Sequence, residues 1–540
     1  MRLAHEPHRG RPLILMLATT TIVAAVLATI LRYRHLAFAQ YDDSYITYRY
    51  AFHLGTGQGW VFNPGESVNS ASSTLYTLAL APFATLGLDA IPVVGATIGF
   101  ASFVTLLALL TWMAVASVTR LTTCVAALVP LVVVGFSAVN QLWVLSGMET
   151  LPFCLVLALA LRQSTLPRIH TIGTLTILCL SLSGLALLRP EGQLLALAIS
   201  LGASWRLWRG RSLAVAAVPP VVVIVIALAQ GIWQVAVFGS LLGTPVAFKS
   251  ISQYYAQSPI EALQQVPGYL LSGMSPSEGP WALAAVVLLT IFVLVVVRQA
   301  VRACGSGRLL IVLMPLTLGL IAFLLFASLA ARSDYFRYLS PLSVFLAVGI
   351  LVLLREIDAS SLSHDERAPQ VLGWAALAVV VVYIPAQLVA AQGLASDVNS
   401  RIYLQQARIE MGRWLESETP PATRVLAGDL GALAYFNPSN VYVDSVGLTN
   451  AVLTEGLVGD ASYRTLIREA GPEWVVDTVG ASGVIGSEAT YDDPEGYYTL
   501  DLDRAEPGSF RLAWRPMLVK RLPPKVDETD AYIGAYILRP

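Results

Sequence analysis

Charged residues are scarce in this chain of 540 residues: they make up 13% of the sequence, whereas hydrophobic residues make up 56%. A soluble globular protein carries about 25% charged and 45–50% apolar residues. The chain also lacks a basic domain or stripe, which excludes a nucleic-acid-binding protein. Its high apolar content excludes a disordered chain as well.

Cysteine and histidine are equally sparse, with four and six residues. The cysteines all fall in or beside apolar runs, without the spacing of a disulfide framework or a metal site. No HxH or HxxxH pair occurs among the histidines, which argues against a histidine metal site. A Walker sequence and a dinucleotide-binding fingerprint are also absent.

The few charges are unevenly distributed along the chain. Residues 1–393 hold 21 basic and 14 acidic side chains, so about 9% of them are charged and the net charge is +7. Residues 394–540 hold 13 basic and 21 acidic side chains, so about 23% are charged and the net charge is −8. This contrast predicts a polytopic α-helical membrane domain over residues 1–393, followed by a soluble domain over residues 394–540.

A membrane-spanning helix needs about 20 mostly apolar residues. We expect about eleven such helices, at residues 12–31, 91–118, 121–138, 149–162, 171–188, 193–207, 213–237, 281–301, 309–330, 336–354 and 371–392. The first run is too long for a signal peptide and has no small-residue cleavage site after it, so we expect it to be retained. The apolar stretch 72–88 is interrupted by Pro82 and Gly87, and we expect it to form a juxtamembrane helix on the outer side.

Basic residues of short loops indicate the orientation, because they are more frequent on the cytoplasmic side. With the N-terminus inside, fourteen basic residues of the membrane domain fall inside and seven fall outside. We therefore expect a cytoplasmic N-terminus and a first outer loop at residues 33–90. An odd number of spans then places the acidic C-terminal domain outside.

Acidic residues of the membrane domain lie mostly in the expected outer loops. They are Asp42, Asp43, Glu66, Glu149, Glu191, Glu261, Glu278 and Asp334. Ionisable groups at membrane depth are costly and usually mark a functional site. A transporter would instead place polar residues and broken helices near the midplane, in paired halves that this sequence does not show. The pattern favours chemistry at the outer surface.

Short apolar segments alternate with helical ones in the C-terminal domain. We expect a helix near 397–417, strands at 423–427, 441–443 and 474–477, a short helix opened by residues 428–431, a helix around 461–470, and strand-like runs over 498–540. This alternation predicts an α/β domain with a small sheet and flanking helices.

The first outer loop is the most informative stretch, because two adjacent carboxylates, Asp42 and Asp43, are followed by several aromatic residues. In a helix, Tyr45 and Arg49 would share one face. We expect this helix at the membrane interface, with its rings among the lipid headgroups and its carboxylates facing water. Two interpretations remain: both acids cap a helix that begins near Ser44, or one of them acts as a general base on an acceptor hydroxyl.

Residues 42–51 (DDSYITYRYA) and 59–66 (GWVFNPGE) resemble the first extracytoplasmic loop of GT-C glycosyltransferases, polytopic enzymes that use polyprenyl-phosphate sugars as donors. They are most similar to those of actinobacterial terminal arabinofuranosyltransferases and their relatives. Further matching pieces follow in the same order, at residues 146–150, 188–192, 238–249, 337–341, 428–431 and 444–448. The chain departs from these relatives at residues 68–72 and 239–245, two differences that bear on the acceptor or the sugar.

The resemblance implies an inverting transfer by single displacement, at the outer face of a bacterial cytoplasmic membrane, with a first-loop aspartate as the base. The relatives use the first acid of the pair, which points to Asp42 as the base and Asp43 as its partner. We assign no metal, although a pair of carboxylates is able to bind a divalent cation.

A lipid phosphate would be the leaving group, and its developing charge needs fixed cations. Four outer residues are candidates for binding the donor phosphate: Arg337, Lys249, Arg189 and Arg49. Arginine favours bidentate phosphate contacts, whereas lysine acts as a point charge. Residues expected to line the substrate cavity are Tyr45, Tyr48, Glu149, Glu191 and Tyr338.

Structural roles remain open for several of these residues. Arg337 stands near a span end, where arginine also serves as an interfacial anchor. Arg189 and Glu191 form a structural pair in the alternative interpretation, and Glu149 caps a span start. We expect Asp429 and Asp444 to shape turns of the C-terminal domain.

The leading hypothesis is transfer of a sugar, such as arabinofuranose, to a cell-envelope glycan during cell-wall biogenesis. Its partners would be the polyprenyl-phosphate donor, the glycan or lipid acceptor and the membrane lipids. A second hypothesis keeps the fold but glycosylates protein or lipid. A transporter or flippase of lipid-linked sugar would tolerate Asp42→Asn, and a cell-envelope scaffold would only bind glycan.

Overall fold

The computed structural model describes residues 10–540 apart from 118–120, 167–170, 210–211, 242, 246–279, 331–336, 360–366, 429, 445–448, 450–470, 480–489, 492–497, 502–510, 522–531 and 539–540. The chain forms two compact units. Unit 1 consists of Met1–Arg34, Ala96–Gln230 and Tyr255–Ala395, and unit 2 consists of His35–Gly95, Gly231–Tyr254 and Ser396–Pro540. Two segments of the N-terminal half thus belong to unit 2, whereas the division predicted after residue 393 considered only the last segment.

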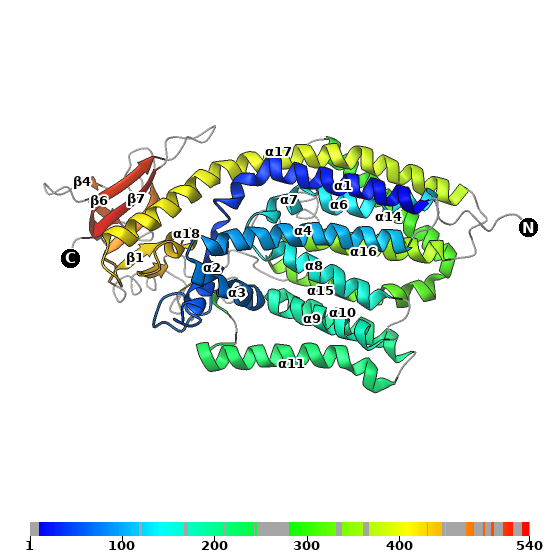
Figure 1. Cartoon of the computed structure of the whole chain (residues 1–540), viewed down its shortest axis with the longest axis horizontal. Coiled ribbons are helices and arrows are strands. Elements are labelled where there is room, and N and C mark those ends of the chain that lie inside the picture. Colours follow the sequence, from blue (N-terminus) through cyan, green and yellow to red (C-terminus); the bar gives the residue numbers. More distant parts are fainter. Residues whose placement is uncertain are drawn as a thin grey trace, which may run out of the picture. The chain divides into compact units, whose positions relative to one another are not determined.

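Unit 1 is built of apolar helices that lie side by side (Figure 1). They are α1 (Gly10–Tyr33), α4 (Ala90–Ser117), α5 (Leu121–Ala126), α6 (Val129–Phe136), α7 (Ala138–Val144), α8 (Thr150–Thr165), α9 (Ile172–Leu188), α10 (Pro190–Trp208), α11 (Leu213–Phe238), α14 (Pro280–Cys304), α15 (Ser306–Ala330) and α16 (Leu339–Asp358). Helix α10 packs against α9 and α15, while α8 packs against α9 and α16. The first residues of α4 and the last of α11 belong to unit 2.

The prediction of a polytopic helical membrane protein is confirmed. Each of the eleven segments expected to span the membrane contains a helix. Seven described helices are long and apolar enough to cross a membrane, or eight if one bent pair forms a single span. Helices α8 and α9 are apolar but shorter, with 16 and 17 residues. Eleven is therefore an upper figure for the number of full spans.

The bent pair is broken at Ser137, between α6 and α7, where the axis turns by 53°. Helix breaks in a membrane protein leave backbone groups that need partners inside the protein. Asn140 donates from Nδ2 to the Val134 carbonyl at 2.9 Å, and Gln387 accepts from the Ala138 N–H at 2.9 Å. Polar side chains near the break therefore satisfy its backbone.

The longest helix, α17 (Arg367–Glu418), has 52 residues and combines the expected span 371–392 with the expected helix 397–417. Its residues up to Ala395 belong to unit 1 and the later ones to unit 2. The intervening residues 393–396 contain Leu394 and Ala395, which are strong helix formers, and no proline, so the helix continues.

Unit 2 contains short helices from the first loop and a sheet from the C-terminal segment. The helical elements are α2 (Asp42–Gly55), α3 (Thr74–Leu80), the 3₁₀ helix η2 (Ala81–Leu86) and α18 (Gly431–Tyr435). Helix α2 packs against α3, η2 and α18. The expected helix 72–88 is thus present as α3 and η2, with Pro82 in the first turn of η2.

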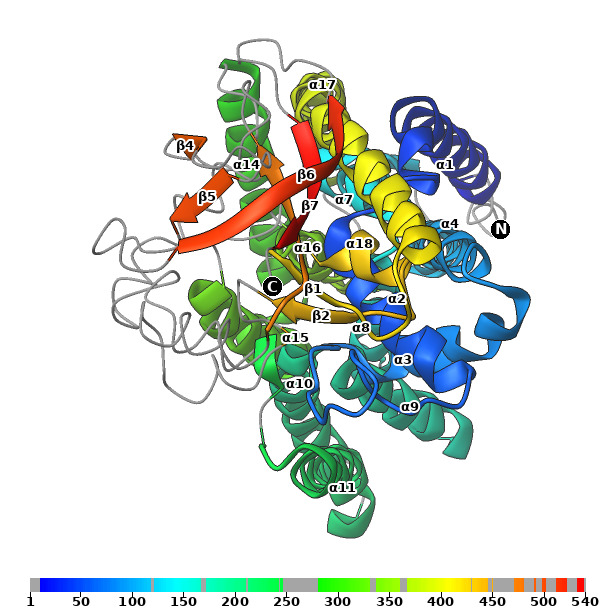
Figure 2. The same cartoon turned by 90° about the vertical axis from the view of Figure 1, so that its left-hand side faces the viewer.

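The sheet has seven strands in the order β2-β1-β3-β7-β6-β5-β4 (Figure 2). The strands are β1 (Arg424–Ala427), β2 (Val441–Asp444), β3 (Trp474–Val479), β4 (Thr490–Tyr491), β5 (Tyr498–Asp501), β6 (Arg511–Arg521) and β7 (Tyr532–Leu538). Strand β1 pairs in parallel with β2 and β3, and the remaining pairs are antiparallel. The expected helix around 461–470 lies outside the described residues.

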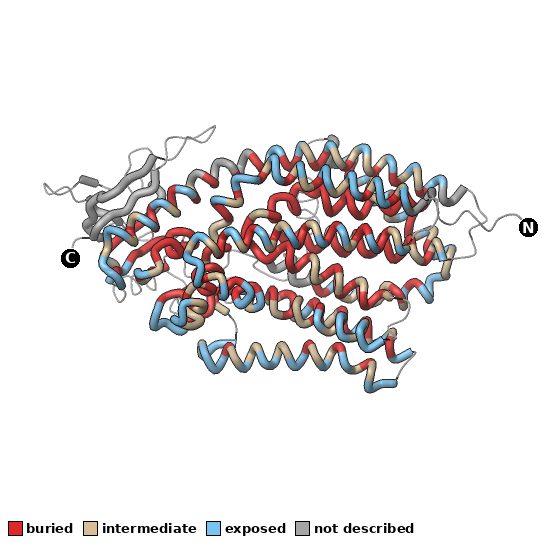
Figure 3. Tube along the Cα trace, viewed as in Figure 1, coloured by how far each residue is buried: buried red, intermediate tan, exposed pale blue. Residues whose placement is uncertain are grey.

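One hydrophobic core joins the first loop to the C-terminal segment within unit 2 (Figure 3). It combines Tyr50 of α2, Met411 of α17, Val425 of β1, Leu433 of α18 and Trp474 of β3. These side chains are distant in sequence and all buried, so the loop folds as part of the same unit as the sheet.

Candidate active-site residues

Helix α2 carries the two acids of the first loop in its first turn. Tyr41, the residue before the helix, has an extended backbone, and no side chain caps the helix start. Asp42 and Asp43 are thus the first two helical residues, where negative charge is favourable at the positive end of the helix dipole. The helix begins two residues earlier than the capping interpretation assumed.

Asp42 is anchored to the C-terminal part of unit 2. Its Oδ2 accepts a hydrogen bond from the Gly431 N–H at 2.9 Å, and its Oδ1 accepts one from the Ala432 N–H at 3.0 Å. Nε2 of Gln405 donates to Oδ1 at 2.9 Å, and the Arg408 guanidinium lies 4.0 Å away. Three donors therefore occupy this carboxylate.

Close packing fixes the same contact from the side of α18. A Cβ atom on Gly431 would lie 2.0 Å from the backbone oxygen of Asp42, so only glycine fits at this position. The contacts of Asp42 come from four residues, none of which is its neighbour Asp43. Successive helical residues point about 100° apart, so the half-buried Asp43 leaves α2 in a different direction.

Tyr45 and Tyr48 belong to the core of unit 2. Their exposed fractions are 1% and 0%, and their rings meet edge to face with centroids 5.4 Å apart. The Tyr45 ring also contacts Tyr435 and Phe436, while the Tyr48 hydroxyl donates to Gln40 Oε1 at 2.5 Å. Both rings pack against protein rather than lipid headgroups, and their role in a substrate cavity stays a prediction.

Arg49 is fully buried. Its guanidinium group donates to backbone carbonyls at the end of α18 and in the loop that follows this helix. It donates to Ala434, to Asn437 at 3.1 Å and to Asn440 at 2.8 Å, and its Nε donates to Phe62 at 2.7 Å. Burial lowers the pKa of Arg49 to about 10. This geometry favours a structural role over the predicted contact with donor phosphate.

Arg189 forms a buried ion-pair cluster in unit 1. It stands at the junction of α9 and α10, in extended backbone before Pro190. Its Nη1 lies 3.0 Å from Glu149 Oε1, and its Nε pairs with Glu191. The exposed fractions of Arg189, Glu149 and Glu191 are 6%, 2% and 4%. Arg189 and Glu191 thus form the pair that the sequence suggested, with Glu149 as a third member.

Arg337 and Tyr338 lie at the start of α16, and both are buried. The guanidinium carbons of Arg189 and Arg337 lie 5.1 Å and 5.6 Å from the centroid of the Tyr338 ring. Two cations therefore converge on one ring, an arrangement stabilised by cation–π attraction. We call Glu149, Arg189, Glu191, Arg337 and Tyr338 the Arg189 cluster.

Some predicted residues are not available for comparison. Lys249, Asp334 and Asp429 lie outside the described residues. Asp444 accepts from the backbone and hydroxyl of Thr449 at 2.7 Å and 3.1 Å, as expected for a turn-forming acid. The described part of the chain holds no group of three or more His, Cys, Asp or Glu side chains that could bind a metal ion.

Sequence reasoning missed the partners of the first loop. The donors to Asp42 from Gln405, Gly431 and Ala432 lie more than 360 residues further along the chain. The only local signal was the glycine at position 431, which occurs in one of the segments that resemble the GT-C enzymes.

Comparisons with known proteins agree with this architecture. Over 96% of its length, the chain is similar to the crystal structure of ArnT from Cupriavidus metallidurans bound to undecaprenyl phosphate, with a TM-score of 0.55. The chain covers 97% of that structure at 12% sequence identity, a likeness that establishes the fold. The molecule is a polytopic membrane protein with an ArnT-like fold.

A family model described as Domain of unknown function (DUF8728) matches residues 398–520, within unit 2. No curated protein matches the chain in sequence.

Proposed function

We propose that the protein is an inverting glycosyltransferase that takes a sugar from a polyprenyl-phosphate donor. The observation that carries this proposal is the fold, which matches ArnT bound to undecaprenyl phosphate over nearly the whole chain. The proposed acceptor is a cell-envelope glycan on the extracytoplasmic side, and arabinofuranose is the sugar suggested by the sequence resemblance. The same fold acting on a protein or lipid acceptor is the alternative.

We assign Asp43 as the general base and Asp42 as the residue that positions α2. This assignment exchanges the two roles suggested by the resemblance. It is supported by the three donors that occupy the Asp42 carboxylate and hold it to α18 and α17. An acceptor hydroxyl would have to displace one of these donors before Asp42 could take its proton.

Of the arginines that the sequence placed on the outer side, we propose that Arg337 and Arg189 bind the donor phosphate. Arg49 is less suited, because its donors are bonded to backbone carbonyls. Glu149 and Glu191 balance the charge of Arg189 and hold it in place. Lys249 remains a candidate from the sequence.

In the proposed reaction, Asp43 takes the proton from an acceptor hydroxyl, whose oxygen attacks the anomeric carbon of the donor sugar. The bond from this carbon to the phosphate oxygen breaks, and the configuration of the sugar is inverted. Polyprenyl phosphate leaves with the electron pair of that bond. Fixed guanidinium groups stabilise its developing negative charge without reorganisation.

A release assay tests the proposal. Purified full-length protein is mixed with a radiolabelled polyprenyl-phosphate sugar and a crude envelope acceptor, and both the lipid phosphate released and the acceptor labelled are measured. Asp43→Asn is expected to lower the rate about 10²–10⁴-fold, the usual contribution of a general base. Arg337→Gln is expected to lower it about 10²-fold through lost charge stabilisation.

Asp89→Asn is the matched control, because Asp89 is 78% exposed and pairs only with the exposed Arg413 among the described residues. Its rate should stay within about twofold of the unaltered protein, as for most surface pairs. If Asp43→Asn retains full transfer while Asp42→Asn abolishes it without loss of folding, the assignment of the base is wrong. Transport of intact lipid-linked sugar that survives both substitutions, without any release, would favour the flippase alternative.

A further inference from the structure

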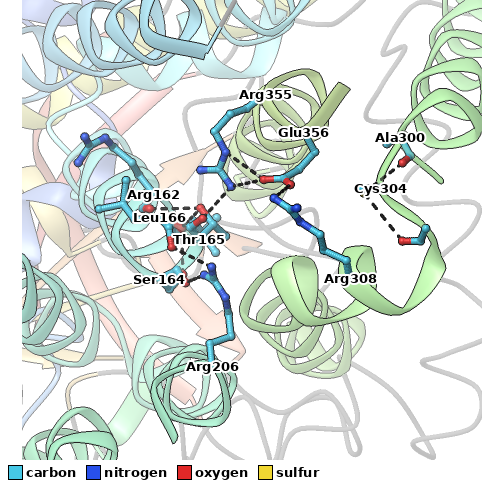
Figure 4. Close-up of polar contacts among 12 residues, drawn as sticks. Arg162, Ser164, Thr165, Leu166, Arg206, Ala300, Cys304, Arg308, Arg355 and Glu356 are labelled. Carbon is cyan, nitrogen blue, oxygen red and sulfur yellow. Dashed lines mark hydrogen bonds and ion pairs between the residues drawn. The ribbon is translucent and has the colours of Figure 1, made fainter. Parts of the chain in front are cut away.

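A second group of arginines gathers at the other end of the unit 1 helices, around the C-terminus of α8 (Figure 4). Arg206 of α10 donates to the carbonyl of Leu166 at 2.8 Å and to that of Ser164. Arg355 of α16 donates to the carbonyl of Thr165 at 2.9 Å. These bonds satisfy carbonyls that a helix end leaves without partners.

One buried acid lies among these cations. Glu356 is 5% exposed and forms ion pairs of 3.0 Å with both Arg355 and Arg308. Arg162, in the last turn of α8, lies with its guanidinium carbon 3.8 Å from the centroid of the Trp112 ring. Of the four arginines labelled in Figure 4, Arg308 and Arg355 pair with this carboxylate, whereas Arg206 is directed at the carbonyls that end α8. We call Arg162, Arg206, Arg308, Arg355 and Glu356 the Arg355 cluster.

The Arg355 cluster retains donors for a further anion. Arg308 is 64% exposed, and among the described residues its guanidinium pairs only with Glu356. Arg355 uses Nε and Nη2 for its contacts to Thr165 and Glu356, and its Nη1 donates to no described residue. Two guanidinium groups with spare donors suit a phosphate, which accepts charge-assisted bonds from both.

Exposed tryptophans mark the depth of the Arg355 cluster. Trp112, Trp205 and Trp208 are 51%, 40% and 56% exposed, on α4 and the end of α10. Arg162 lies on the Trp112 ring, and Arg209 lies 5.4 Å from the centroid of the Trp205 ring. Tryptophan on apolar helices is enriched at the membrane–water interface. The Arg355 cluster therefore lies at the depth of lipid headgroups.

An apolar groove of about 480 Å³ lies between α14, α15 and α16. Its walls include Val297 of α14, Leu313 of α15 and residues Leu339 to Leu353 of α16. Leu353 lies three residues before Glu356 and on the same face of α16, so the apolar wall ends one helical turn before the acid that pairs with Arg308 and Arg355. At 1.5 Å per residue, the α16 wall extends over about 21 Å. This exceeds the depth of about 15 Å of one leaflet in a 30 Å hydrocarbon core.

We propose that the Arg355 cluster and the groove bind an anionic phospholipid, with its phosphate at Arg308 and Arg355 and an acyl chain along α16. Charge and shape agree on this occupant, because the cationic cluster lies one helical turn beyond an apolar groove of the length of an acyl chain. The site lies at the opposite end of α16 from Arg337 and does not depend on the proposed glycosyl transfer.

Native mass spectrometry of the purified full-length protein in a neutral detergent tests the proposal. The protein is titrated with phosphatidylglycerol and with phosphatidylcholine of the same acyl chains. We expect phosphatidylglycerol to bind at least about tenfold more tightly, which corresponds to about 1.4 kcal/mol. Arg308→Gln and Arg355→Gln should each remove most of this preference, since each removes one guanidinium group and its charge-assisted hydrogen bonds to the phosphate.

Arg302→Gln is the matched control, because Arg302 is an exposed arginine of α14 outside the Arg355 cluster. It should retain the preference, and so should Arg337→Gln. The exposed Arg308 gives a variant that folds even if Arg355→Gln does not, and thermal melting checks both. Val293→Trp, which adds bulk at the α14 wall of the groove, should weaken binding of both lipids.

Four results would overturn the proposal. Equal binding of the two lipids would show that the protein does not recognise the headgroup. If Arg302→Gln loses as much of the preference as Arg308→Gln, the preference comes from general surface charge. If Arg337→Gln weakens binding more than Arg308→Gln, the lipid enters from the other end of α16. Inorganic phosphate that binds as tightly as the lipid, with no effect of Val293→Trp, would indicate a soluble anion instead.

Discussion

Two charged residues of α2 hold the same short helix from its two ends. Asp42 accepts hydrogen bonds from N–H groups at the start of α18, and Arg49 donates to carbonyls at and beyond its end. The negative side chain thus meets the positive end of the helix dipole and the positive side chain meets the negative end. Both residues lie in the segment that suggested catalysis, yet their contacts are those of structural anchors.

Asp42→Asn is expected to destabilise unit 2. The amide keeps the shape of the side chain but loses the charge, and one of its oxygens becomes a nitrogen that faces a backbone N–H. Hydrogen bonds to charged groups contribute about 1.5–3 kcal/mol each, so we expect a loss of about 2–3 kcal/mol. A thermal melt of the purified protein in detergent should show a midpoint several degrees lower.

The control for this prediction is again Asp89→Asn, which removes an equal charge from an exposed ion pair of the same unit. Its melting midpoint should hardly change. An unchanged midpoint for Asp42→Asn would show that the contacts to α18 do not stabilise the fold.

His53, in the last turn of α2, makes stability depend on pH. Burial, and next the positive charge of Arg49, lower the pKa of His53 from 6.5 to about 4. The unfolded chain therefore takes up a proton near pH 6.5 that the folded protein refuses until about pH 4. The contribution of neutral His53 to the free energy of unfolding is fully present above pH 6.5. It is lost as the pH falls towards 4, and the loss is about 3 kcal/mol at most.

Thermal melts between about pH 7 and pH 4.5 measure this effect, and His53→Gln should flatten the curve. Burial raises the pKa of Glu66, which contributes in the opposite direction. Comparing His53→Gln with the unaltered protein cancels that contribution. Identical slopes for the two proteins would contradict a buried neutral histidine.

Among the helices, close approach of α9 and α10 shapes the Arg189 cluster. Gly192 lies in the first turns of α10, one residue after Glu191, and a Cβ there would lie 1.9 Å from the backbone oxygen of Leu185 in α9. Gly192→Ala should force the two helices apart and cost about 1–3 kcal/mol, as overpacking of a core does. A thermal melt gives the size of the effect.

Gly393→Ala is the matched control for this substitution. Gly393 lies inside α17, and a Cβ there would meet no atom within 4 Å. Alanine should therefore stabilise this helix by about 0.5–1 kcal/mol. If Gly192→Ala behaves like Gly393→Ala, the contact between α9 and α10 is looser than the structure indicates.

The helices and the sheet were largely predictable, because local patterns determine them. Long apolar runs predicted a helix in all eleven segments, and β-branched runs predicted β1, β2 and β3. The length of α17 was not predictable from its apolar run, since the polar residues after the span are also good helix formers. The break at Ser137 was not predicted either, because no proline or glycine pair marks this position in the sequence.

The candidate site was harder to predict than the elements that carry it. Asp42, Asp43, Arg189 and Arg337 were singled out because charges are rare in a membrane chain. The partners of Asp42 and Arg49 were not predicted, since hydrogen bonds between α2 and residues 405–440 depend on tertiary packing. The same limit led to Tyr45 being assigned to lipid headgroups, because an aromatic residue beside a span has the same sequence pattern whether it faces lipid or protein.

At the scale of the whole molecule, topology is the prediction on which an extracytoplasmic glycosyl transfer depends. The excess of arginine on one set of loops predicts that the Arg355 cluster, which includes Arg308, faces the cytoplasm and that the first loop lies outside. Asp89 and Arg308 are exposed residues of these two sets, with side chains 78% and 64% accessible. Each position can therefore report the side of the membrane on which it lies.

Cysteine labelling of intact cells decides the orientation. In a variant whose four native cysteines are replaced, Asp89→Cys should react with a membrane-impermeant maleimide, while Arg308→Cys should react only after the cells are opened. Replacing the native cysteines is necessary because Cys304, at the end of α14, is itself partly accessible. Labelling of Arg308→Cys in intact cells would invert the topology, and the acid pair would then face nucleotide sugars rather than an extracytoplasmic acceptor. A lipid-linked donor would no longer be needed to reach that face, and the polyprenyl-phosphate assignment would then rest on the ArnT-like fold alone.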